Sequence, residues 1–253
     1  MERKAPWNRI IWLALFSIAM GFLETTVVIY LRQIYYPGGF RFPLTLMDSQ
    51  IITVELLREI GTVVMLVSVA ALAGRSFNQR LAYFLAAFSI WDLFYYVFLK
   101  LMLDWPESFL TWDILFLIPV PWIGPVLAPC LISVTMLLFA ATLLYHDIHN
   151  PSHRLRNTDW ALLIPGSLLV ILSWTWDYFV LSFRNDESPE EALAVLSNFI
   201  PQSYPWWLFL SGEILLLWGI FSFWKRRRMK SEKLKVKSER LPVAPSPKTN
   251  EII

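Results

Sequence analysis

Three charged residues lie within little more than one helical turn of an apolar stretch that is long enough to cross a membrane. The segment VELLREIGT, residues 54–62, contains Glu55, Arg58 and Glu59, followed by Thr62. Their spacing of i, i+3, i+4 and i+7 places all four on one face of an α-helix. Carboxylates so grouped can bind a cation or proton, or act as general acid and base, and an arginine can hold an anion. This face is therefore the first candidate functional surface.

Ionisable side chains recur in four other apolar stretches of the chain. Asp92, Tyr96 and Lys100 share one helical stripe, so Lys100 is a candidate ion-pair partner of Asp92. The full set of candidate ligand-binding residues is Glu24, Glu55, Arg58, Glu59, Asp92, Tyr96, Lys100, Asp177 and Glu213. Within that set, Glu55, Arg58, Glu59 and Asp92 form the expected centre. The catalytic residues of any reaction stay unknown at this level.

Six long apolar stretches must position these residues. The chain of 253 residues is 56% hydrophobic and only 17% charged, and its mean hydropathy is +0.49. Each stretch has about 22 residues and would be about 33 Å long as a helix, enough to cross a bilayer. We therefore expect an all-α, polytopic membrane protein with a six-helix transmembrane bundle in residues 1–224. The stretches lie near residues 10–31, 50–73, 81–103, 121–145, 160–181 and 204–224.

The distribution of basic residues predicts the orientation. Seventeen of the 22 Lys and Arg residues fall on one side of the expected bundle and three on the other. Basic loops face the cytoplasm, so both termini are expected there, in a bacterial-type inner membrane. Residues 225–253 hold ten of the basic residues, and we expect a disordered polybasic tail. The tail would contact anionic lipid or serve only as a topology anchor; no nucleic-acid partner is expected.

The cost of placing charged side chains in a membrane limits where they can lie. A charge at the centre of a membrane helix costs about 2.5–3.5 kcal/mol, so six acids and two bases facing lipid would cost on the order of 20 kcal/mol. We expect them to turn inward and to form a polar pocket that opens outward and is sealed on the cytoplasmic side. A purely structural ion-pair network is the alternative, but such a network would balance its charges.

A proline-rich segment precedes the fourth stretch. FLIPVPWIGPVLAP, residues 116–129, contains four prolines and one glycine, so a continuous helix is not expected through it. We predict a short outer or re-entrant helix over residues 111–118, then a break that forms a wall or lid of the pocket. A proline-kinked entry into the fourth helix is the alternative. A short amphipathic helix is also predicted over residues 188–199, where Ser188 and Glu191 suit a capping box.

Histidine and cysteine, which commonly bind metals and cofactors, are few in this sequence. All three histidines, His146, His149 and His153, lie in one segment that is interrupted by a proline, and Cys130 is the single cysteine. Neither a metal site nor a cofactor is expected.

Three classes of function fit these patterns. The leading one is a transporter or permease-like protein that binds a cation, proton or small polar ligand in the pocket. The second is a membrane-embedded acid–base enzyme acting on a lipid or isoprenoid, with Glu55 and Glu59 as acid and base and Arg58 holding an anion. The third is an assembly or scaffold subunit whose charges meet the helices of a membrane partner.

Overall fold

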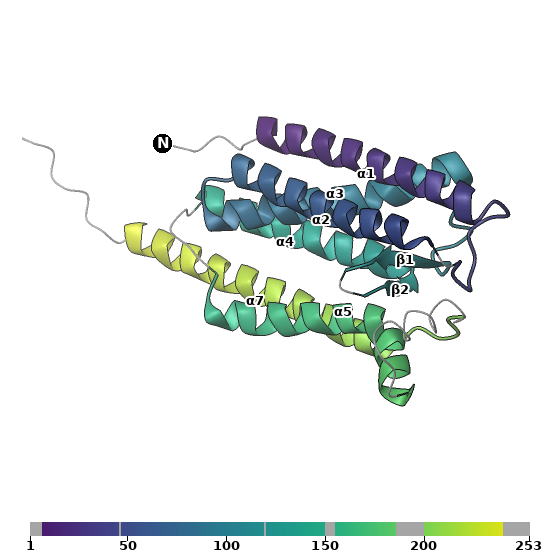
Figure 1. The fold of residues 1–253 in the computed structure, drawn as a ribbon. Coiled ribbons are helices and arrows are strands. Elements are labelled where there is room, and N and C mark those ends of the chain that lie inside the picture. Colours follow the sequence, from purple (N-terminus) through teal and green to yellow (C-terminus); the bar gives the residue numbers. More distant parts are fainter. Residues whose placement is uncertain (1–6, 46, 119, 150–154, 186–199, 240–253) are drawn as a thin grey trace, which may run out of the picture.

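Six long helices and one β-hairpin make up the described part of the chain (Figure 1). The computed structural model describes residues 7–45, 47–118, 120–149, 155–185 and 200–239. The helices are α1 (Trp7–Tyr35), α2 (Ser49–Ala73), α3 (Phe77–Leu103), α4 (Leu127–His149), α5 (Asn157–Asn185) and α7 (Trp206–Glu239). Each is long and apolar enough to cross a membrane. The predicted all-α, six-helix membrane bundle is confirmed.

Capping residues fix where α2 and α3 begin. The Asp48 carboxylate accepts a hydrogen bond of 2.8 Å from the backbone N–H of Gln50, and Ser76 accepts one of 3.2 Å from Gln79. Both side chains satisfy amide groups that have no partner within their helix. Gly74 ends α2 where a Cβ atom would lie 2.6 Å from the Arg80 backbone nitrogen. Only a glycine allows this tight connection, which makes α2 and α3 antiparallel neighbours.

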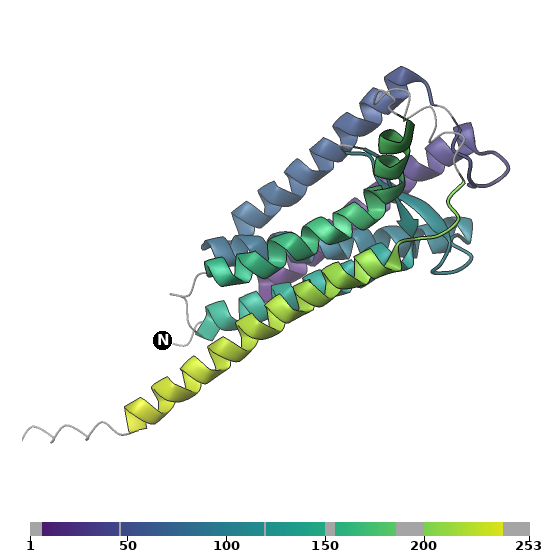
Figure 2. The ribbon, with the colours of Figure 1, turned by 90° about the horizontal axis from the view of Figure 1, so that it is seen from below.

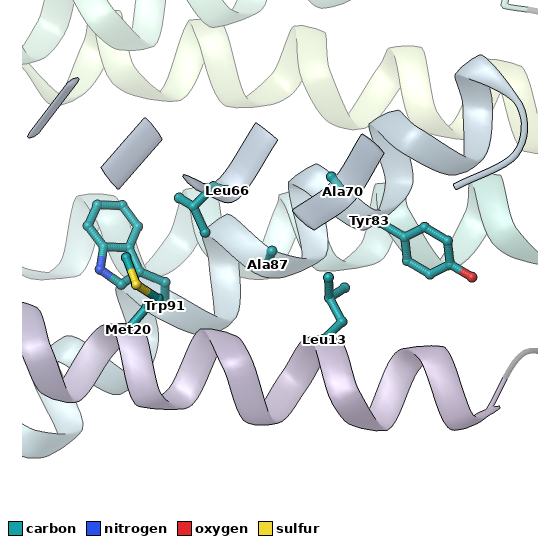
Figure 3. Close-up of a cluster of buried hydrophobic side chains, with 7 residues drawn as sticks. All are labelled: Leu13, Met20, Leu66, Ala70, Tyr83, Ala87 and Trp91. Atoms are coloured by element: carbon teal, nitrogen blue, oxygen red, sulfur yellow. The ribbon is translucent and has the colours of Figure 1, made fainter. Parts of the chain in front are cut away.

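Helix α3 is the centre of one half of the bundle, where it packs against α1, α2 and α4, whereas α5 packs mainly against α7. An apolar cluster joins α1, α2 and α3 toward the end of the bundle where α1 begins (Figure 3). Close packing of this kind is what excludes water from a protein interior. The cluster consists of Leu13, Met20, Leu66, Ala70, Tyr83, Ala87 and Trp91.

Glycines bring α5 and α7 into backbone contact. A Cβ atom added to Gly212 would lie 2.7 Å from the carbonyl oxygen of Gly166, and one added to Gly166 would lie 3.0 Å from that of Gly212. Small residues allow membrane helices to approach this closely, and van der Waals packing then holds them together. The α5–α7 pair is therefore a tightly closed unit.

The proline-rich segment forms a β-hairpin, so the helix predicted over residues 111–118 is wrong. Strand β1 (Trp112–Phe116) pairs antiparallel with β2 (Trp122–Pro125), and Ile114 lies opposite Ile123. Aromatic and β-branched residues favour strands, and Pro121 prevents the chain from continuing as a helix. The predicted break before the fourth span is confirmed, because α4 begins only at Leu127.

The last helix continues past the predicted end of the membrane span. Helix α7 runs to Glu239, so residues 225–239 are helical and the expectation of a disordered tail is wrong for them. Lys, Arg, Met, Glu and Leu are good helix formers, and extension of an existing helix needs no new nucleus. Residues 240–253 lie outside the described part, as does the helix predicted over residues 188–199. Figures 1 and 2 show the start of α1 and the end of α7 at the end of the bundle opposite the hairpin.

Candidate ligand-binding site

A cavity of about 510 Å³ lies between α1, α2, α3 and the hairpin. The connection between α1 and α2 supplies part of its wall, and Tyr178 of α5 supplies another part. The wall residues of this connection are Tyr36, Phe40, Leu44, Thr45 and Met47. Six of the nine predicted site residues line the cavity: Glu24, Glu55, Arg58, Glu59, Asp92 and Tyr96. The sequence pattern therefore identified most of the ionisable lining, although these residues come from three different helices.

Arg58 links two of the carboxylates. Its Nε donates a hydrogen bond of 2.8 Å to Oε2 of Glu55, and its Nη2 lies 2.7 Å from the same oxygen. Its Nη1 pairs with Oε2 of Glu24, so the guanidinium group ties α1 to α2. One arginine thus serves two carboxylates, and this network keeps one excess negative charge if both are ionised.

Glu59 contacts the hairpin instead of Arg58. Its Oε2 accepts a hydrogen bond of 2.9 Å from the backbone N–H of Leu117, just after β1. Backbone that is not helical is tolerated inside a membrane protein only where its polar groups find partners. Glu59 is 7% exposed, and its other oxygen, Oε1, has no hydrogen-bond partner among the described residues. A buried carboxylate of the cavity wall therefore has unused capacity to accept a hydrogen bond.

Asp92 approaches the cavity from α3. Its Oδ2 accepts a hydrogen bond of 2.7 Å from the hydroxyl of Ser133 on α4. The predicted pairing of Asp92 with Lys100 is wrong. Lys100 lies in the last turn of α3, where its Nζ is 2.7 Å from the Asp104 carboxylate and 3.1 Å from the carbonyl oxygen of Pro106. Half of its side chain is exposed, as expected for a long lysine that reaches from a helix end toward water.

Arg32 and Asp113 line the cavity although they were absent from the predicted set. Nη2 of Arg32 lies 3.2 Å from Oδ1 of Asp113, and the Tyr96 hydroxyl donates a 3.3 Å hydrogen bond to Oδ2. The Arg32 guanidinium also lies over the rings of Trp105 and Phe40, at 3.8 and 4.6 Å from their centroids. Burial raises the pKa of Asp113 to about 6, although Arg32, the Ile114 N–H and Tyr96 oppose the shift.

A sequence signal for this second pair existed. Arg32 follows Glu24 by eight residues, about two turns of the same helix, and therefore continues the side of α1 that carries Glu24. Asp113 lies in the segment where the sequence predicts a short helix, and only the hairpin brings it to the cavity.

The other predicted residues lie elsewhere: Lys100, Asp177 and Glu213 do not line the cavity. Glu213 on α7 accepts a hydrogen bond from the Thr135 hydroxyl of α4, and its Oε2 is buried with no partner in the described chain. Asp177 is a half-buried residue of α5. Helical periodicity places these side chains at a suitable depth, but it does not indicate which of them face the cavity.

The lining combines an excess of acid with apolar walls. Five carboxylates line the cavity (Glu24, Glu55, Glu59, Asp92 and Asp113), whereas only two guanidinium groups do (Arg32 and Arg58). Glu59 and Asp92 have no ion-pair partner among the residues that the structure describes. Apolar side chains supply much of the remaining wall: Val28, Leu31, Leu44, Met47, Ile52, Leu56, Ile114, Leu115, Phe116, Leu117, Val120 and Pro121.

Within the described ranges, no three His, Cys, Asp or Glu side chains are grouped closely enough to hold a metal ion. Comparison of the chain with protein families, with curated proteins and with solved structures finds no match.

Proposed function

We propose that this membrane protein binds a cation, a proton or a small polar ligand in the cavity, in a transporter or permease-like role. The observation that carries the proposal is the imbalance of the lining, where five carboxylates meet two guanidinium groups. Unpaired buried charge is expensive, so a network selected only for stability would balance. A bound cation or proton would supply the missing positive charge.

The orientation is part of the proposal. The hairpin end would face the outside of a bacterial-type inner membrane, and both termini would lie in the cytoplasm, since basic residues concentrate at the opposite end. The ligand would then enter from outside. Transport would require a rearrangement of α1–α3, because the apolar cluster of Figure 3 fills the space between these helices on the other side.

Binding can be tested by measuring the thermal stability of the purified protein with a panel of inorganic cations and organic amines and over a range of pH. A ligand that binds only the folded state raises the melting temperature, and the rise grows with the logarithm of its concentration above Kd. We expect stabilisation of the wild type and its loss in the double variant Glu59→Gln, Asp92→Asn, which keeps both hydrogen-bond acceptors. The matched control is the double variant Asp177→Asn, Glu213→Gln, which removes two acids outside the cavity. Equal responses in all three proteins would contradict the proposal.

The apolar walls favour one second candidate, an acid–base enzyme acting on a lipid or isoprenoid. The cavity touches both α2 and Tyr178 of α5, yet these two helices do not pack extensively against each other. An acyl or isoprenoid chain would enter between them, and Glu59 would exchange a proton with the head group. The distinguishing measurement is mass spectrometry of lipids incubated with the protein. A product that forms with the wild type and not with Glu59→Gln would favour the enzyme over a binding protein.

The basic end of α7 suggests a lipid partner. Residues 225–230 include Lys225, Arg226, Arg227, Arg228 and Lys230, and a juxtamembrane cation near anionic lipid contributes about 1 kcal/mol. Arg226 is also tied to α5, because it pairs with Asp159 and donates a 2.9 Å hydrogen bond to Thr158. We propose contact with anionic head groups, which predicts that the protein is more heat-stable in bilayers containing phosphatidylglycerol than in phosphatidylcholine alone.

A further inference from the structure

We infer that the ligand of the cavity is an organic amine with an apolar body, and not an inorganic ion or a small hydrophilic cation. This inference rests on the proposed function and names its ligand class. It depends on three features of the cavity: its size, its apolar walls and the positions of two carboxylates.

The size and the apolar walls of the cavity suit an organic ligand. An inorganic cation would fill a small part of a 510 Å³ cavity and leave the rest bounded by apolar side chains. Cavities of about 300–1,000 Å³ with apolar walls and few polar groups are typical of sites for organic molecules. Burial of an apolar ligand surface against such walls contributes about 25 cal/mol per Å². Leu31, Ile52 and Leu56 are examples of the side chains that would contact the ligand body.

The position of the ammonium group follows from two carboxylates. Glu59 lies ten residues after Ser49, where α2 begins, and Asp92 lies eleven residues before Leu103, where α3 ends. At 1.5 Å per residue, both are about 15–17 Å from the hairpin end of their helices. Among the described residues, Glu59 keeps one oxygen without a hydrogen-bond partner, and Asp92 accepts a hydrogen bond only at Oδ2. A primary ammonium group can donate three hydrogen bonds, so it can pair with a cavity carboxylate that still has an oxygen without a partner.

Aromatic side chains complete the site. Trp91, Tyr95 and Phe116 also line the cavity. The face of an aromatic ring attracts an organic cation, and this attraction strengthens where water is excluded. The lining therefore suits both parts of one molecule: carboxylates and rings for the cationic head, aliphatic groups for the body.

A set of rigid probes that share one apolar body can test the inference. The probes are 1-aminoadamantane, 1-adamantanol and adamantane-1-carboxylate, with methylammonium and Na⁺ as cations that lack the body. Binding to the full-length protein in detergent is measured by calorimetry. We expect the amine to bind at least tenfold more tightly than the alcohol. A hydrogen bond that involves a charged group contributes about 1–1.5 kcal/mol more than a neutral one, which corresponds to about tenfold in affinity. The carboxylate and methylammonium should show no binding at the same concentrations.

Variants separate the contributions of the head and the body. Glu59→Gln with Asp92→Asn should weaken amine binding at least tenfold and leave alcohol binding unchanged. Ile52→Ser should weaken both the amine and the alcohol. The matched control Asp177→Asn with Glu213→Gln should change neither. Size-exclusion profiles and melting temperatures establish that each variant is folded.

The outcomes distinguish this inference from the proposed function. If methylammonium or Na⁺ binds as tightly as 1-aminoadamantane, and that binding needs Glu59 and Asp92, the cavity is a cation site but the apolar-body inference is wrong. If no cation binds and pH has no effect on stability, both are wrong. If the alcohol binds as tightly as the amine, the carboxylates do not recognise the head group and the inference is again overturned.

Discussion

The two halves of the bundle place similar acids in different surroundings. Around α3, the carboxylates of Glu24, Glu59 and Asp92 line one cavity beside the hairpin. In the α5–α7 half, Glu213 contacts Thr135 of α4 and lies next to a backbone contact between two glycine residues. The acids around α3 therefore share a cavity with the hairpin, whereas Glu213 lies beside a close glycine contact between α5 and α7.

The largest effect is expected from Arg58→Ala. The substitution leaves Glu24 and Glu55 in the cavity without their shared basic partner, and breaking a buried ion pair costs about 3–5 kcal/mol. Thermal unfolding in detergent should show a much lower melting temperature. Adding Glu24→Gln and Glu55→Gln to this variant should restore most of the loss. A single variant as stable as the wild type would mean that Arg58 does not hold the α1–α2 contact.

The pH dependence of stability should depend on Asp113. Its pKa is raised to about 6 in the folded protein from an ordinary value of 3.8, with Arg32 of α1 and Tyr96 of α3 facing it. Between these values the folded state holds a proton that the unfolded state releases, so stability falls as pH rises from about 4 to 6. A shift of this size corresponds to about 3 kcal/mol. The stability difference between wild type and Asp113→Asn should change across this window and stay constant above pH 7.

Substitution of Gly212 by alanine tests the closed half. The new methyl group would lie 2.7 Å from the Gly166 carbonyl oxygen, so α5 and α7 would have to separate. Overpacking of this kind costs about 1–3 kcal/mol. Amine binding in the cavity should not change. Gly61→Ala on α2 is the matched control, because no atom lies within 4 Å of its added Cβ, and it should be neutral or slightly stabilising.

The smallest effect is expected from Glu213→Gln. The amide oxygen can still accept the hydrogen bond from Thr135, so stability should change by less than about 1 kcal/mol. Ligand binding should be unaffected, in contrast to Glu59→Gln. A loss of binding in the Glu213 variant with normal stability would move the functional site to the other half of the molecule.

The membrane spans could be predicted because length and hydropathy alone determine them. The second span was expected near residues 50–73 and runs from Ser49 to Ala73. The hairpin could not be predicted, because its strands are only five and four residues long and resemble an interrupted helix. Its pairing depends on contacts with distant residues, such as Leu117 with Glu59, which no local pattern contains.

The candidate site was predictable to the extent that helical faces determine it. The stripe of Glu55, Arg58 and Glu59 followed from spacing, and all three residues line the cavity. Asp113 was missed because it reaches the cavity through the hairpin. Glu213 does not line the cavity, because depth in the membrane does not reveal which neighbours a helix has. That choice depends on side-chain volume at the contact, here on Gly166 and Gly212.

The most direct test of a water-accessible cavity is the reactivity of single cysteines in a Cys130→Ser background. Leu56 lines the cavity, Leu57 is 63% exposed on a face of α2 that does not line it, and Leu66 is fully buried in the apolar cluster. Each is replaced in turn by cysteine in membrane vesicles and treated with a cationic, membrane-impermeant thiosulfonate. The account predicts rapid modification at position 56 from the hairpin side, and little at 57, which faces lipid, or at 66. Modification at 57 with none at 56 would contradict it.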